Sequence, residues 1–137
     1  MVSEKYFPLV QLFIFILYFC RMEESKKYRT IFFYKGYFDD FYQKQRAKVK
    51  NKILWTLRII ETLPIVPELY LKHIEDTDGL YEIRIQHGSD IFRVFCFFDQ
   101  GQLIVLVNGF QKKTKKTPKS ELEKALKIKA EYEQEKQ

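Results

Sequence analysis

The stretch Leu80–Lys119, LYEIRIQHGSDIFRVFCFFDQGQLIVLVNGFQKKTKKTPK, decides the fold of this chain. It holds three runs rich in β-branched and aromatic residues, which favour strands, at 80–86, 91–98 and 103–110. Turn-forming pairs, Gly88-Ser89 and Gln100-Gly101, separate the runs. The stretch therefore predicts two consecutive β-hairpins, and hence an antiparallel sheet, followed by a cluster of lysines.

Strand and helix patterns precede this stretch. Residues 28–34 (YRTIFFY) are aromatic and β-branched, which predicts a strand. From Tyr37 to about Leu63, apolar residues recur at helical spacing, with lysines and arginines on the opposite face. This pattern predicts a long amphipathic helix, whole or broken near Lys50, which ends at Pro64.

The C-terminal part of the chain predicts one more helix. Thr117 is a good N-cap and Pro118 a good first helical residue, and the helical pattern continues to about Glu133. We therefore expect an α+β fold, in which a small antiparallel sheet of about four strands packs against N-terminal helices and a C-terminal helix follows.

Composition limits the class of protein. The chain has 137 residues, which suits one domain, and its formal net charge of +6 favours an anionic partner such as nucleic acid, an acidic protein or a membrane surface. The two cysteines, Cys20 and Cys96, form no disulfide framework, so we expect a reducing, cytoplasmic location. His73 and His87 lack the spacing of zinc ligands, and we expect no metal and no cofactor.

The N-terminal run Tyr6–Cys20 (YFPLVQLFIFILYFC) is apolar but shorter than the roughly 17–25 residues of a spanning helix. Three interpretations compete: a weak membrane anchor through residues 6–20, a helix that packs on the domain or a partner, and an extension upstream of a translation start at Met22. We favour the third. The expected organisation is an extension over 1–21 and a single domain over 22–137.

The turn positions predict which residues face one another across the sheet. A turn at Gly88-Ser89 places Arg84 directly opposite Arg93, and a similar turn in the second hairpin places Asn108 beside Arg93. Side chains alternate between the two faces. One face is then wholly apolar and should pack on the long helix; it carries Tyr81, Ile83, Ile85, Phe92, Val94, Cys96, Phe98, Leu103, Val105 and Val107. The other face is polar with an aromatic border; it carries Glu82, Arg84, Gln86, Arg93 and Asn108, with Phe95, Phe97, Leu106 and Phe110.

Two arginines that face each other repel, so their pairing requires a compensating group. One explanation is structural, with Glu82 or Asp90 bridging the guanidinium groups. The other is functional, with the pair awaiting an anion such as phosphate, which guanidinium binds in bidentate fashion. The lysine cluster beside the pair favours the functional explanation, because together they are typical of a surface that binds a nucleic-acid backbone.

These residues resemble a known family. The chain is similar to the RelE/ParE toxin superfamily, and more closely to its HigB-like branch, the phage-derived Gp49-like proteins. The resemblance covers roughly residues 28–132 and rests on motifs along consecutive strands: Asp78–Arg84 (DGLYEIR), Phe92–Phe95 (FRVF), Val105–Thr114 (VLVNGFQKKT) and Lys116–Pro118 (KTP).

The resemblance implies the toxin of a type II toxin–antitoxin system. It implies a ribosome-dependent endoribonuclease that cuts mRNA in the ribosomal A site and is paired with an antitoxin, often of the helix-turn-helix type. The reaction would be attack of the ribose 2′-hydroxyl on the adjacent phosphate, without a metal. The resemblance also implies a fold with two helices before the central strands and one after.

The same resemblance implies roles for individual residues. Arg84 and Arg93 would contact the scissile phosphate and stabilise its developing charge. Lys112 or Lys113 would act as acid or base, and Glu82 or His87 as the proton acceptor. The remaining candidates would bind RNA: Asn108, Lys115, Lys116 and Lys119. Two alternatives stay open, a non-enzymatic ParE-like toxin of a protein target such as DNA gyrase, and a binding module without toxicity, tethered to membranes through residues 6–20.

Overall fold

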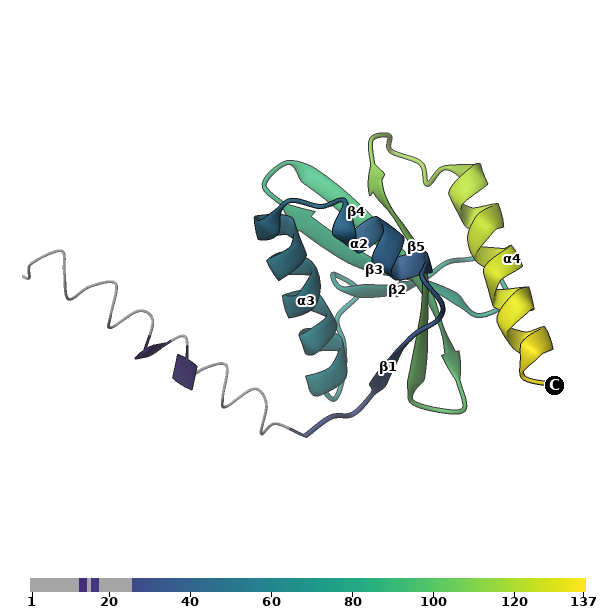
Figure 1. Ribbon diagram of the computed structural model, residues 1–137, viewed down its shortest axis with the longest axis horizontal. Coiled ribbons are helices and arrows are strands. Elements are labelled where there is room, and N and C mark those ends of the chain that lie inside the picture. The colour runs from purple at the N-terminus through teal and green to yellow at the C-terminus, as the bar shows by residue number, and fades with distance from the viewer. Residues whose placement is uncertain (1–12, 15, 18–25) are drawn as a thin grey trace, which may run out of the picture.

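The computed structural model describes residues 13, 14, 16, 17 and 26–137 and has the α+β architecture expected from the sequence (Figure 1). Five strands form one sheet in the order β1-β5-β4-β3-β2. Along the chain the elements are β1 (Thr30–Phe33), α2 (Tyr37–Gln43), α3 (Ala47–Thr62), β2 (Leu71–His73), β3 (Leu80–His87), β4 (Asp90–Asp99), β5 (Leu103–Lys112) and α4 (Lys119–Glu135).

The sheet is mostly antiparallel, as expected, and has one strand more than the approximately four expected. The additional strand is β2, which is three residues long and pairs antiparallel with β3. Strand β1 pairs parallel with β5, with Thr30 beside Leu103 and Phe33 beside Leu106. A parallel pair needs a long crossover connection, and here that connection includes α2, α3 and the three other strands.

The long helical segment is two helices, and the break falls earlier than the sequence predicted. Helix α2 ends at Gln43, and α3 begins at Ala47 after Arg46, whose backbone is extended. No break occurs at Lys50, because Val49 and Ile53 lie on one buried face of α3 and their packing keeps this turn helical.

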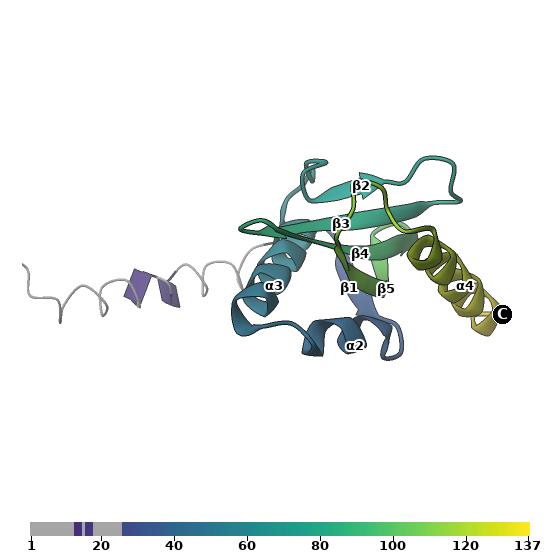
Figure 2. The ribbon, with the colours of Figure 1, turned by 90° about the horizontal axis from the view of Figure 1, so that it is seen from above.

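Two hydrophobic clusters lie on opposite faces of the sheet. The helices α2 and α3 cover one face and α4 covers the other, so that the strands lie between α3 and α4 (Figure 2). The first cluster joins α2 and α3 to the sheet through Phe38, Phe41, Val49, Ile53, Leu57, Ile60, Ile83, Ile85, Phe92, Val94, Cys96, Ile104 and Leu106. The second joins α4 and Tyr34 to it through Leu80, Phe95, Phe97, Val105, Val107, Phe110, Ala125 and Ile128.

The register of the first hairpin is the predicted one, with Arg84 opposite Arg93 and His87 opposite Asp90. The register of the second hairpin is not. Asp99 pairs with Leu103, so the connecting loop has three residues instead of two, and Arg93 faces Phe110 rather than Asn108.

A β-bulge in β5 causes the rest of the difference. Val94 pairs with Gly109 and Cys96 with Leu106, so Val107 and Asn108 together oppose Phe95. The three-residue loop places Leu106 in the cluster under α3 and Val105 on the α4 side, and at the bulge Val107 also packs with α4. The sequence assignment of these three β5 residues to the faces was wrong. The bulge also keeps Asn108 on the face that carries Phe95.

Gly109 occupies the most crowded backbone position next to this bulge. A Cβ atom at residue 109 would lie 2.4 Å from Cδ1 of Phe41, whose side chain is buried. We therefore expect Gly109→Ala to lower the free energy of unfolding by about 2 kcal/mol, because a methyl group must displace a packed ring. Denaturant titration followed by circular dichroism measures this. Gly36→Ala is the matched control, since a Cβ there meets only Oδ1 of Asp40 at 4.0 Å.

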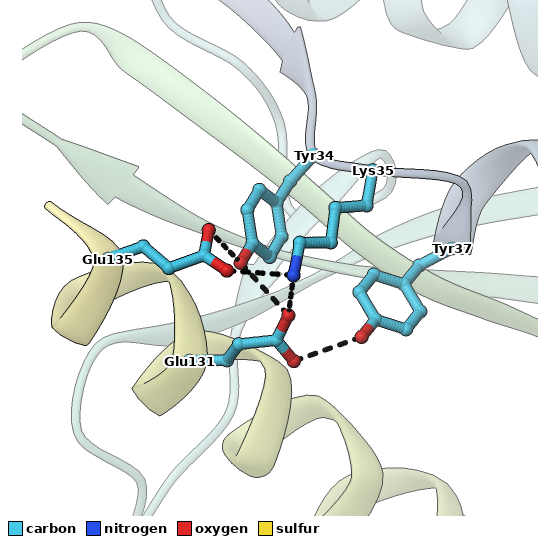
Figure 3. A network of polar contacts seen from close by, with 5 residues as sticks. All are labelled: Tyr34, Lys35, Tyr37, Glu131 and Glu135. Carbon is cyan, nitrogen blue, oxygen red and sulfur yellow. Dashed lines mark hydrogen bonds and ion pairs between the residues drawn. The ribbon is translucent and has the colours of Figure 1, made fainter.

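Polar contacts fix the C-terminal half of α4 to the start of the domain. Tyr34, Lys35 and Tyr37 converge on Glu131 and Glu135 (Figure 3). Lys35 forms ion pairs with both glutamates, and the Tyr34 hydroxyl donates to Oε2 of Glu135 at 2.7 Å. Burial and these acceptors raise the pKa of Tyr34 to about 12. This half of α4 is therefore held by oriented hydrogen bonds as well as by apolar packing.

Asp99 holds the same helix from the end of β4. The Tyr132 hydroxyl donates to Oδ2 of Asp99 at 2.7 Å, and Lys136 forms an ion pair with Oδ1. The hydrogen bond from Lys136 and, to a lesser extent, the one from Tyr132 lower the pKa of Asp99 below its ordinary value of 3.8. A carboxylate with a lowered pKa stabilises the fold above its ordinary pKa, and this stability is lost as the pH falls through the lowered value.

We therefore expect the wild-type chain to lose stability more steeply than Asp99→Asn between about pH 5 and pH 2. Thermal unfolding followed across this pH range gives the comparison. Asp76→Asn serves as the control, because Asp76 is exposed and has no ion pair among the described residues. Parallel pH curves for the wild type and Asp99→Asn would show that Asp99 does not hold α4.

Among the residues that the structure describes, no helix is both long and apolar enough to cross a membrane. Most of the apolar run Tyr6–Cys20 lies outside these residues, and so does the boundary expected near Met22.

Candidate functional site

The site is centred on the arginine pair, Arg84 on β3 and Arg93 on β4, which face each other as predicted. Glu82, two residues before Arg84 on the same strand, lies between them. Its Oε1 is 3.6 Å from Nε of Arg84 and its Oε2 is 3.7 Å from Nε of Arg93. The structural explanation offered by the sequence is thus confirmed for Glu82, which is the counter-ion of both guanidinium groups. Two arginines and one glutamate still leave a formal charge of +1.

The two arginines differ in burial. The side chain of Arg84 is 33% exposed, whereas Arg93 is 6% exposed as a residue. Arg93 donates from Nη1 to the carbonyl oxygen of Phe92 at 3.1 Å, and its Nε is buried without a hydrogen-bond partner. Burial lowers the pKa of Arg93, although Glu82 opposes this effect. A buried guanidinium with an unpaired donor is costly for the fold, and the Glu82 carboxylate, 3.7 Å from this Nε, offsets part of that cost.

Asp90, the other carboxylate considered as a bridge, does not contact the pair. Its Oδ2 accepts a hydrogen bond from Nη2 of Arg46 at 2.9 Å. Nδ1 of His87 lies 3.3 Å from the same nitrogen. Because residues alternate along β3, His87 lies on the α3 side of the sheet, away from Arg84. The structure therefore separates His87 from the arginine pair.

The lysines continue the site at the end of β5. Lys112 pairs with Ile91, the residue two before Arg93 on β4, and so lies half-buried on the arginine side of the sheet. The next lysines belong to the loop before α4 and to its first residue, and all are exposed: Lys113, Lys115, Lys116 and Lys119. They form a basic segment that leaves the sheet where the arginine pair lies.

Asn108 connects the site to α4, and this connection was not found from the sequence. Asn108 is only 2% exposed, and its Nδ2 donates to the backbone oxygen of Glu121 at 3.2 Å and to Oε2 of Glu121 at 2.9 Å. Its Oδ1 is buried without a partner. Glu121 lies in the first turn of α4, and only the β5 bulge and the docking of α4 bring it to Asn108.

This arrangement suits an anion with a hydroxyl group close to it. Arg84 is accessible, Arg93 adds positive charge from beneath, and Lys112 supplies an ammonium on the same side. Glu121 supplies a carboxylate. In the part of the chain that the structure describes, no group of three or more His, Cys, Asp or Glu residues could hold a metal ion.

Comparison with known protein families gives a match over most of the domain. The sequence model of a protein family described as "Phage derived protein Gp49-like (DUF891)" matches residues 40–130, about two thirds of the chain. The matched region contains α3, all strands except β1, and every residue of the site. No curated protein matches the chain.

Proposed function

The chain belongs to the Gp49-like family of phage-derived proteins, a family of RelE/HigB-like toxins, and on this premise we propose that it is a ribosome-dependent endoribonuclease that cleaves mRNA. Family membership indicates the toxin of a toxin–antitoxin pair, and hence an antitoxin as partner. The proposal adds the reaction, the ribosome and the mRNA, and it places the protein where translation occurs, in the cytoplasm.

The observation that carries the proposal is the arginine pair with a single counter-ion. Evolution toward stability alone would replace a nearly buried arginine that has an unpaired donor, because apolar residues of similar volume serve a core better. A scissile phosphate bound at the accessible Arg84 would account for the positive charge that Arg93 keeps beneath it, since a phosphate is an anion. Exposed lysines beside the pair suit the backbone of the same RNA.

In the proposed reaction the ribose 2′-oxygen attacks the adjacent phosphorus and the bond from phosphorus to the 5′-oxygen breaks. The products are a 2′,3′-cyclic phosphate and a 5′-hydroxyl. Arg84 contacts the phosphate, and Arg93 stabilises its developing charge through the electrostatic field. Lys112, as an ammonium on the arginine side, donates a proton to the leaving 5′-oxygen, a role to which Lys113 is less suited because it lies beyond β5 in the exposed loop.

The remaining candidates take supporting roles. Lys113, Lys115, Lys116 and Lys119 bind the phosphate backbone of the RNA. Glu82 is the counter-ion of the arginines in the free protein. His87 lies on the other side of the sheet, so we give it no part in proton transfer.

Expression of the full chain from a tightly controlled promoter tests the proposal. Primer extension on a reporter mRNA should reveal new 5′ ends inside translated codons, and these ends should disappear when the start codon of the reporter is removed. Growth arrest without new 5′ ends would instead support a non-enzymatic toxin of a protein target. Co-expression of a small protein encoded beside this gene should relieve the arrest if that protein is the antitoxin.

A further inference from the structure

We propose that Glu121, in the first turn of α4, is the general base that accepts the proton of the ribose 2′-hydroxyl, and that Asn108 orients it. This inference rests on the proposed function and supplies the proton acceptor that the arginines cannot provide, because guanidinium groups stay protonated. Nothing in the sequence alone brings residues 108 and 121 together.

The first support is the way in which Asn108 holds Glu121. The side-chain amide of Asn108 is nearly buried, and its Nδ2 donates both of its hydrogen bonds to Glu121, one to the backbone oxygen and one to the carboxylate Oε2. Both partners are acceptors, which fixes the orientation of the amide group. Asn108 thus sets the start of α4 and the direction of the carboxylate together. A base oriented by a second group is the arrangement that proton abstraction requires.

The second support is that the other carboxylates near the site are occupied. Glu82 is the counter-ion of two arginines, and Asp90 pairs with Arg46 on the far side of the sheet. Glu121 is half-buried and forms no ion pair with any residue that the structure describes. Its Oε1 accepts no hydrogen bond from the described residues and is available to a ligand.

The third support is the position of Asn108 and Glu121 relative to the arginine pair. Asn108 lies on β5 two residues before Phe110, which is the residue opposite Arg93. Neighbouring strands are about 4.8 Å apart and residues along one strand about 3.3 Å apart, so Asn108 lies close to Arg93 on the same side of the sheet. Glu121 is reached from Asn108 by one hydrogen bond. Arg84 lies on the next strand beyond Arg93, so we place the phosphate over the arginine pair with the 2′-hydroxyl of its nucleotide directed toward Glu121.

Each proton in the reaction has a donor and an acceptor. The 2′-hydroxyl gives its proton to the Glu121 carboxylate as the bond between the 2′-oxygen and phosphorus forms. The bond to the 5′-oxygen breaks, and this oxygen takes a proton from the Lys112 ammonium. Glu121 then returns its proton to Lys112 through water, which restores both groups.

Charged residues also lie on the elements around Glu121. Helix α4 itself carries Lys119, Glu123 and Lys124 close to it in sequence. The strands against which α4 packs contribute Lys112 from β5 and Arg93 from β4. Cations predominate among these neighbours.

The variant Glu121→Gln tests the inference, because glutamine keeps an oxygen that accepts from Asn108 but cannot take the proton. With ribosomes programmed with a defined mRNA, we expect the single-turnover cleavage rate at neutral pH to fall about 10²–10⁴-fold. We also expect the rise of the rate with pH to disappear. Thermal stability and binding to the programmed ribosomes should stay within about twofold of the wild type, since the hydrogen bond is retained.

Glu133→Gln is the matched control, with the same substitution on the same helix at an exposed residue that pairs with Lys129 and not with the site, and it should cleave at the wild-type rate. A Glu121→Gln variant that cleaves within threefold of the wild type, with the same pH profile, would overturn the inference while leaving the proposed function intact. A wild-type chain that cleaves no mRNA on ribosomes would overturn both.

Discussion

Replacing Arg84 by alanine is expected to lower the rate of mRNA cleavage about 10²–10³-fold, the usual effect of removing one group that stabilises developing charge. Arg84 is the exposed member of the arginine pair, so it is the one that a phosphate from solvent reaches directly. The fold should persist, because the aliphatic part of the side chain is only partly buried and its removal frees Glu82 to pair with Arg93 alone. Single-turnover cleavage of mRNA on ribosomes measures the effect.

One further variant separates bidentate binding by Arg84 from its positive charge, and a second variant is a control. Arg84→Lys keeps the positive charge but loses bidentate binding, and should recover only part of the rate. Arg58→Ala removes an arginine from α3, away from the site, and should cleave as the wild type does. An Arg84→Ala variant that is folded and as active as the wild type would exclude the arginine pair as the phosphate site.

Replacing Glu82 by alanine is expected to lower the free energy of unfolding by about 3 kcal/mol, because two facing guanidinium groups then lack their counter-ion. Both the Glu82 and Arg93 side chains are largely buried, at 12% and 7% exposure, which weakens screening by water. Inorganic phosphate should restore more stability to Glu82→Ala than it adds to the wild type, since the anion takes the place of the carboxylate.

Denaturant titration with and without phosphate tests this expectation. Glu82→Gln preserves the size of the side chain and should be destabilised in the same direction, which separates loss of charge from loss of packing. Glu75→Ala is the control, because Glu75 is exposed and lies in the loop between β2 and β3, outside the arginine pair. Equal stability of Glu82→Gln and the wild type would show that the arginines do not need Glu82.

The first hairpin could be predicted residue by residue because its turn is short and its strands are regular, so one turn position fixes the pairing of Arg84 with Arg93. The second hairpin could not. Its loop has three residues, and the bulge at Val107 and Asn108 adds one residue to β5. Neither feature can be detected from the alternation of apolar and polar residues, because nearly all of β5 is buried on both faces.

Site residues that are close together in the sequence could be predicted, whereas those that tertiary packing brings together could not. Arg84, Arg93 and Glu82 lie within one hairpin, and the basic residue Lys112 follows on the next strand. His87 was misplaced because the sequence argument considered its closeness to a turn and not the side of the sheet that its position selects. Glu121 was missed because a contact between β5 and α4 depends on how the helix docks, which tertiary packing decides.

We propose that this chain cleaves mRNA only on the ribosome, and a cleavage assay with purified components tests this proposal. The full chain is mixed with ribosomes carrying a defined mRNA with a known codon in the A site, and the products are mapped by primer extension. We expect a cut within the A-site codon that leaves a 2′,3′-cyclic phosphate and a 5′-hydroxyl, and an uncut mRNA when ribosomes are omitted. An mRNA that stays intact on the ribosomes would contradict this proposal.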